Sequence, residues 1–68
     1  MEAASKGERY ARIFRKAGVF IGKGDIARAI ETLKEGVTLA EANGDRAMVR
    51  RFIEEIGRIQ KPTDPQAP

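Results

Sequence analysis

Gly22, Lys23 and Gly24 form a small basic cluster that could hold a phosphate group. A phosphate-binding loop reads G-x-x-x-x-G-K followed by Ser or Thr and comes after a strand, so that backbone N–H groups surround the phosphate and the hydroxyl reaches magnesium. Counted from Gly18, Lys23 comes one residue too early, Gly24 stands where the hydroxyl residue should be, and the preceding residues have helical periodicity. We therefore interpret the cluster as the end of one helix and the start of the next.

Side chains that could act as a nucleophile or a general base are almost absent. The 68-residue chain has no cysteine and no histidine, so neither group is available to activate the hydroxyl of Thr32 or Thr38, and thiolate and imidazole metal ligands are missing. Glu54 and Glu55 are adjacent, and neighbours on a helix point about 100° apart, so the two carboxylates cannot share a proton. The sequence predicts no enzyme activity, no metal site, no cofactor and no small-molecule substrate.

Three stretches of the chain have apolar residues three and four positions apart, which is the spacing of one helix face. They predict helices over about residues 6–22, 25–42 and 46–60, and an all-α fold in which an antiparallel helical hairpin is followed by a third helix. Residues 1–61 are expected to form a single helical domain. Residues 62–68 contain all three prolines of the chain and are expected to be a disordered tail.

The expected helix ends coincide with residues that favour capping. Ser5, followed three residues later by a glutamate, matches a capping box. The dipeptide Gly-Asp occurs at both junctions between helices, as Gly24-Asp25 and Gly44-Asp45, twenty residues apart. Glycine adopts the left-handed conformation that ends a helix without steric cost, and aspartate is a favoured N-cap. The two junctions therefore predict two turns of the same kind.

Charge and hydropathy limit the class of protein. Thirteen Lys and Arg residues against ten Asp and Glu give a net charge of +3, which is a weak nucleic-acid signal. The first ten residues lack an apolar run of signal-peptide length, and nowhere do about 18 apolar residues follow one another. We expect a cytoplasmic protein that does not bind membranes. A domain of this size buries only about 60% of the surface of its unfolded chain, so stability must come from helix packing or from a partner.

Small and large residues recur at fixed spacing across the first two predicted helices, at Ile13, Ala17, Phe20, Gly24, Ala29, Leu33 and Gly36. This pattern resembles a tetratricopeptide repeat, a pair of antiparallel helices. The chain departs from the family where Lys16 replaces leucine, Ala17 replaces glycine and Glu41 replaces the final proline. A longer repeat of about forty residues accounts for Glu41 and places Ile53 on Ile13 and Gly57 on Ala17. The chain then resembles one and a half repeats.

The resemblance implies a protein-binding module, an adaptor or scaffold whose concave surface is lined mainly by first helices. On this chain the groove positions would be Ala11, Phe14, Gly18 and Ile21 in the first helix and Arg51, Glu54 and Arg58 in the third. An apolar groove edged with arginine suits an amphipathic helix with acidic flanks. The apolar members of this set could equally be core residues.

The number of repeats bears on self-association. Repeat proteins bury their apolar faces by stacking neighbouring units, and one and a half repeats is short for this purpose. This shortage predicts a homo-oligomer or a permanent protein partner. Alternatively, the three apolar stripes could cover one another in a closed three-helix bundle.

A small basic nucleic-acid-binding protein of the helix-turn-helix type is the alternative interpretation. Basic residues form a stripe on the first helix and enrich the third, at Arg9, Arg12, Lys16 and Lys23 and at Arg46, Arg50, Arg51 and Arg58. Such clusters can neutralise phosphates. However, the third helix also carries Glu54 and Glu55, and it has no Asn or Gln near its start to read bases. The sequence therefore favours a protein partner over nucleic acid.

Overall fold

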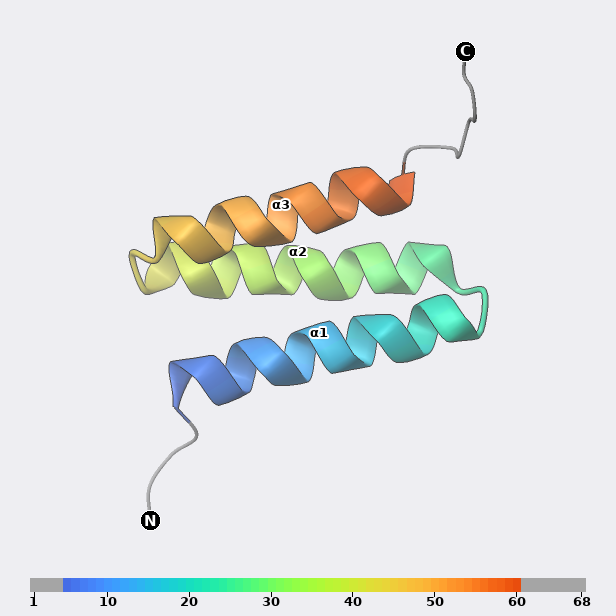
Figure 1. The fold of residues 1–68 in the computed structure, drawn as a ribbon, viewed down its shortest axis with the longest axis horizontal. Helices are drawn as coiled ribbons and strands as arrows, with labels where there is room; N and C mark the ends of the chain where they lie inside the picture. Colours follow the sequence, from blue (N-terminus) through green and yellow to red (C-terminus); the bar gives the residue numbers. More distant parts are fainter. Residues whose placement is uncertain (1–4, 61–68) are drawn as a thin grey trace.

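The computed structural model describes residues 5–60, which form three α-helices joined by two short turns. The helices are α1 (Lys6–Gly22), α2 (Ile26–Ala42) and α3 (Arg46–Gln60), and Figure 1 shows each one antiparallel to the next. The predicted all-α fold is confirmed. The second helix begins one residue later than predicted because Asp25 is its N-cap. The segment 62–68, expected to be a disordered tail, lies outside the described residues.

Each helix begins with a side chain that accepts a hydrogen bond from the backbone of its first turn. The N–H of Glu8 donates to Ser5 Oγ at 3.2 Å and the N–H of Ser5 donates to the Glu8 carboxylate at 3.4 Å, which completes the predicted capping box. The carboxylates of Asp25 and Asp45 accept from the backbone N–H three residues on, at 3.2 and 3.3 Å. These bonds satisfy N–H groups that have no partner within the helix.

The two turns have the same backbone structure. Gly24 and Gly44 have φ of 79° and 69°, in the left-handed region that glycine adopts without a steric penalty. The N–H of Asp25 donates to the carbonyl of Phe20 at 2.8 Å, and the equivalent bond from Asp45 to Ala40 is 2.9 Å. This is the Schellman pattern of helix termination, so the predicted equivalence of the two Gly-Asp junctions is confirmed.

The three helices form an open layer with α2 in the middle (Figure 1). α2 packs against both neighbours, whereas no Cα atom of α1 lies within 8 Å of one in α3. A closed three-helix bundle would bring all three pairs of helices together. The closed bundle is therefore not the arrangement that forms, and each outer helix has α2 as its only backbone neighbour.

The core lies where α2 meets the outer helices, and small residues allow the close approach. Ala29 and Ala40 on α2 are fully buried, Leu33 is 1% exposed and Ala17 on α1 is 2% exposed. A Cβ added to Gly36 would lie within 3.0 Å of three atoms of the Phe52 ring, so glycine is required for this ring to rest on α2.

Aromatic rings connect α1 to α3 across the layer. Phe14 stacks on Phe52 with ring centroids 4.5 Å apart and planes 10° apart. Tyr10 meets the same ring edge-on at 5.8 Å and 69°, a favoured geometry for aromatic pairs. The side-chain amide of Asn43 donates to the Tyr10 hydroxyl at 3.0 Å, which ties the start of α1 to the turn between α2 and α3.

Candidate interaction surfaces

The backbone at the Gly22-Lys23-Gly24 cluster is already engaged within the protein. The N–H of Lys23 donates to the carbonyls of Val19 and Phe20, and the N–H of Gly24 donates to Ile21 at 2.9 Å. A phosphate site of the loop type needs these N–H groups to point toward the ligand. They terminate α1 instead, so the interpretation of the cluster as a helix end is supported by its hydrogen bonds.

The hydroxyl and carboxyl groups considered for chemistry serve local structure. Thr32 is buried, and its hydroxyl donates to the carbonyl of Arg28 at 2.8 Å, while Thr38 makes the same kind of bond to Lys34 at 3.3 Å. Glu55 pairs with Arg58 at 3.5 Å. Within residues 5–60 no three acidic side chains gather in a way that could hold a metal ion.

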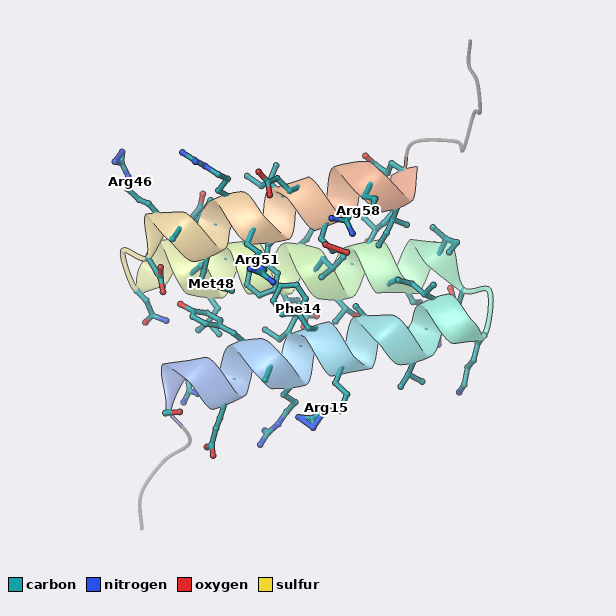
Figure 2. All side chains as sticks on the ribbon, viewed as in Figure 1. Phe14, Arg15, Arg46, Met48, Arg51 and Arg58 are labelled. Atoms are coloured by element: carbon teal, nitrogen blue, oxygen red, sulfur yellow. The ribbon has the colours of Figure 1, made fainter. Side chains whose placement is uncertain are left out.

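The expected groove between α1 and α3 is partly filled by its own aromatic residue. Phe14 is half-buried because its ring stacks on Phe52, and Cζ of Arg51 lies 5.9 Å from the centroid of the Phe14 ring, within cation–π range. Figure 2 shows Phe14, Arg51 and Met48 on the side where α1 faces α3. The structure thus brings together two of the predicted groove residues, and it gives Phe14 a packing role that sequence reasoning had left open.

The other predicted groove residues do not all lie on one surface. Ala11, Gly18 and Ile21 are exposed on α1, and Ile21 is 41% exposed. Arg58 is engaged by Glu55 on its own helix. Glu54 does not join them, because it lines a groove that also contains Ile53 and Arg50. The seven predicted residues therefore divide between two surfaces.

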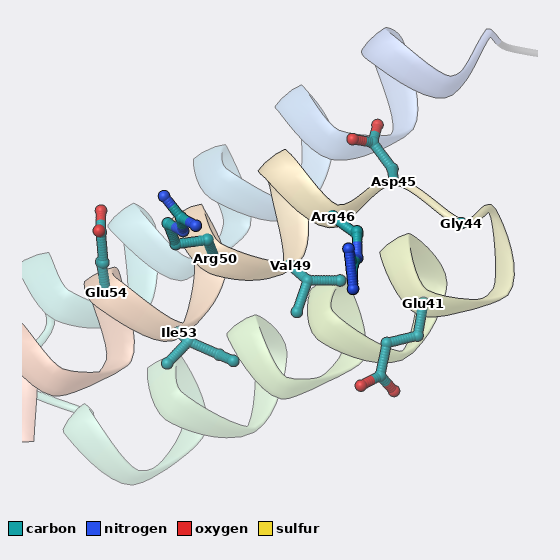
Figure 3. Close-up of a pocket in the computed structure, with 8 residues that line it drawn as sticks. All are labelled: Glu41, Gly44, Asp45, Arg46, Val49, Arg50, Ile53 and Glu54. Atoms are coloured by element: carbon teal, nitrogen blue, oxygen red, sulfur yellow. The ribbon is translucent and has the colours of Figure 1, made fainter.

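The groove that contains Glu54 runs along the outer edge of α3 and has a volume of about 700 Å³ (Figure 3). Glu41 on α2 and the turn 44–45 close one end, and its α3 lining is Arg46, Val49, Arg50, Ile53 and Glu54. Ile53 is 53% exposed, the same as Val19, and no other large apolar side chain in the described part of the chain is more exposed. We call this groove, together with the charged side chains that line it, the α3 edge.

Sequence reasoning missed the α3 edge as a site, although its signal was present. The apolar arc of the third helix runs through Val49, Phe52, Ile53, Ile56 and Ile59. This arc is wider than one neighbouring helix can cover. Phe52 is fully buried against α2 while Ile53, the next residue, remains exposed. The width of the arc predicts a second contact surface on this helix.

The outer side of α1 is the most basic surface. Residues 6–22 contain five Lys and Arg and one Glu. Arg12, Arg15 and Lys16 surround Val19, which is 53% exposed. Figure 2 shows Arg15 pointing away from the layer. The charged side chains around Val19 are all basic, whereas the α3 edge carries charges of both signs.

Comparisons of the chain with models of protein families, with curated proteins and with solved structures gave no match. None of the three described helices is long and apolar enough to cross a membrane.

Proposed function

We propose that the protein is a non-catalytic protein-interaction module, an adaptor or scaffold that binds a helical segment. The observation that carries this proposal is the α3 edge, where Ile53 is 53% exposed beside Val49 in an open groove. An apolar surface with a polar rim is typical of a protein-binding site. No further helix of the described residues covers it.

The resemblance to one and a half tetratricopeptide repeats explains why this edge would be open. In the first repeat, Ile13 is half-buried and Ala17 is 2% exposed because α2 covers them. The equivalent residues of the second repeat, Ile53 and Gly57, are exposed. They stand where a fourth helix would pack. We propose that a helix of a partner packs there. A cytoplasmic location, which the sequence predicts, is part of the proposal.

Photo-crosslinking tests the proposal. A benzophenone amino acid at position 53 should give a covalent adduct with a protein in the cell of origin or with the protein itself. The same group at position 19 is the matched control, because Val19 is also 53% exposed but lies on α1. Specific adducts from position 53 alone would support the proposal. Equal adducts from both positions, or none from position 53, would contradict it.

Nucleic-acid binding is the second candidate, and the basic outer side of α1 is the observation that favours it. Arg12, Arg15 and Lys16 lie together there and could contact phosphates. The arrangement of α2 and α3 does not favour a helix-turn-helix, because that motif crosses its helices at about 90–120° and these helices lie antiparallel (Figure 1). A salt-sensitive shift of a labelled duplex, lost in the Arg12→Glu/Arg15→Glu variant, would favour this candidate, and the absence of a shift at low salt would exclude it.

A further inference from the structure

Along α3, the two apolar side chains of the α3 edge are followed one turn later by a position that has no side chain. Val49, Ile53 and Gly57 are four residues apart, so they lie on one side of the helix. Val49 is half-buried and Ile53 protrudes, whereas a Cβ added to Gly57 would have no neighbouring atom within 4 Å. A second helix can therefore approach the bare backbone at Gly57 closely.

The rim of the same groove carries charges of both signs. Arg50 and Glu54 are one turn apart and both line the groove (Figure 3). Within residues 5–60 neither has an ion-pair partner within 4.0 Å, since the pairs at that distance are Arg28 with Asp25 and Arg58 with Glu55. A partner with one sign of charge would meet a like charge on this rim, so the rim favours a partner that presents both signs in the opposite order.

We infer that the occupant of the α3 edge is a second copy of this chain, whose α3 lies antiparallel to the first about a two-fold axis near Ile53. This inference rests on the proposed function and names its partner. Reversal of the helix direction places Val49 of each copy opposite Gly57 of the other and brings the two Ile53 side chains together. It also places Arg50 of each copy near Glu54 of the other. In a two-fold arrangement every such contact occurs twice.

The expected strength follows from the length of the contact. α3 has 15 residues and is therefore about 22 Å long. A single pair of helices of this length gives an interface at the small end of the range for specific complexes. The dimer should dissociate with a constant on the order of tens of micromolar.

Sedimentation equilibrium of the full chain tests the association, over about 1 μM to about 1 mM. The wild type should change from monomer to dimer over this range. Ile53→Glu should raise the dissociation constant at least tenfold, and Val19→Glu, at an equally exposed position on α1, should leave it unchanged. Far-UV circular dichroism of both variants is the control and should show that they remain helical.

Charge exchange at the rim tests the antiparallel arrangement without changing apolar contacts. Arg50→Glu and Glu54→Arg should each weaken the dimer, because each places like charges together. The double variant Arg50→Glu/Glu54→Arg should restore it, because two copies then again present opposite charges to each other. Failure of the double variant to restore association would contradict the proposed arrangement.

The absence of cysteine from the chain allows a direct test of direction. An Ile53→Cys variant should form a disulfide-linked dimer on mild oxidation, faster than Val19→Cys at the same concentration. Val49→Cys alone should not cross-link above the Val19→Cys rate, whereas a mixture of Val49→Cys and Gly57→Cys should form the mixed dimer. Rapid cross-linking of Val49→Cys alone indicates parallel helices and contradicts the inference.

Different results would contradict the dimer and the protein-binding function. A wild-type chain that stays monomeric at about 1 mM overturns the inference. If the crosslinker at position 53 then captures a different protein, the proposed function stands and that protein occupies the α3 edge. If position 53 captures neither another protein nor a second copy, both are overturned.

Discussion

At the scale of single residues, Gly36 is the position where a side chain is least tolerated. The Phe52 ring rests on it, is fully buried and also stacks on Phe14. Alanine in a helix is more favourable than glycine by about 1 kcal/mol, but overpacking a core typically costs about 1–3 kcal/mol. Because the stacked ring has little freedom to move, we expect the steric cost to be larger.

Gly36→Ala should therefore lower the free energy of unfolding by about 1 kcal/mol or more, measured by urea denaturation at a fixed protein concentration. Gly18→Ala is the matched control, since Gly18 is also within a helix and has no atom within 4 Å of an added Cβ. That variant should be more stable by about 1 kcal/mol. Stabilisation of similar size in both variants would show that Phe52 does not pack on Gly36.

At the scale of helices, α2 packs along both neighbours, whereas α1 and α3 meet each other only through the rings of Tyr10, Phe14 and Phe52. The buried side chains of α2 occur along most of its length, whereas on α3 Phe52 alone is buried. Opening α1 or α3 breaks the contact of that helix with α2 and the ring contact, whereas opening α2 breaks its contacts with both outer helices. Backbone amides in proteins exchange with solvent through such openings.

Hydrogen exchange followed by NMR should show the slowest amides in α2, around Leu33 and Ala40. Amides of α1 near Val19 should exchange faster, because that helix can detach while α2 and α3 stay together. The measurement should be made at low protein concentration, where α3 has no second copy to protect it. Uniform exchange across all three helices would mean that the molecule opens only as a whole.

Much of the element structure could be predicted from the sequence because its signals are local. Apolar spacing indicates a helix, and Ser5, Asp25 and Gly44 act on backbone atoms within a few residues. The choice between an open layer and a closed bundle could not be predicted this way. Periodicity shows which face of a helix is apolar but not which neighbour covers it.

Periodicity also could not show which neighbours the individual side chains of the candidate site contact. Phe14 was expected at a groove and lies half-buried against Phe52, a residue 38 positions away in the sequence. Glu54 was grouped with Arg51 and Arg58, yet it lines the α3 edge. The first assignment depends on where α3 sits relative to α1 and the second on which side of α3 meets α2, and only the tertiary structure determines these.

At the scale of the whole molecule, α3 contributes a large part of the core. α3 supplies Phe52, one of the two largest fully buried side chains, the other being Leu33. Without α3, the apolar side of α2 around Gly36 would face water. Helical segments of this length are marginal in water when they lack tertiary contacts.

A fragment of residues 1–43 should consequently be largely unfolded at 25 °C, with a weak far-UV circular dichroism signal and no cooperative thermal transition. The control is a fragment of residues 1–60, which keeps all three helices and should unfold cooperatively. A cooperative transition in the shorter fragment would show that α1 and α2 form an independent hairpin.

Aromatic rings fill the space between α1 and α3, which have no backbone contact with each other. The outer helices are both attached to α2, and their own contact runs through Tyr10, Phe14 and Phe52. We therefore expect the distance between α1 and α3 to depend on the volume of these rings. Smaller side chains at these three positions should let the outer helices move closer together, with no change to the two turns.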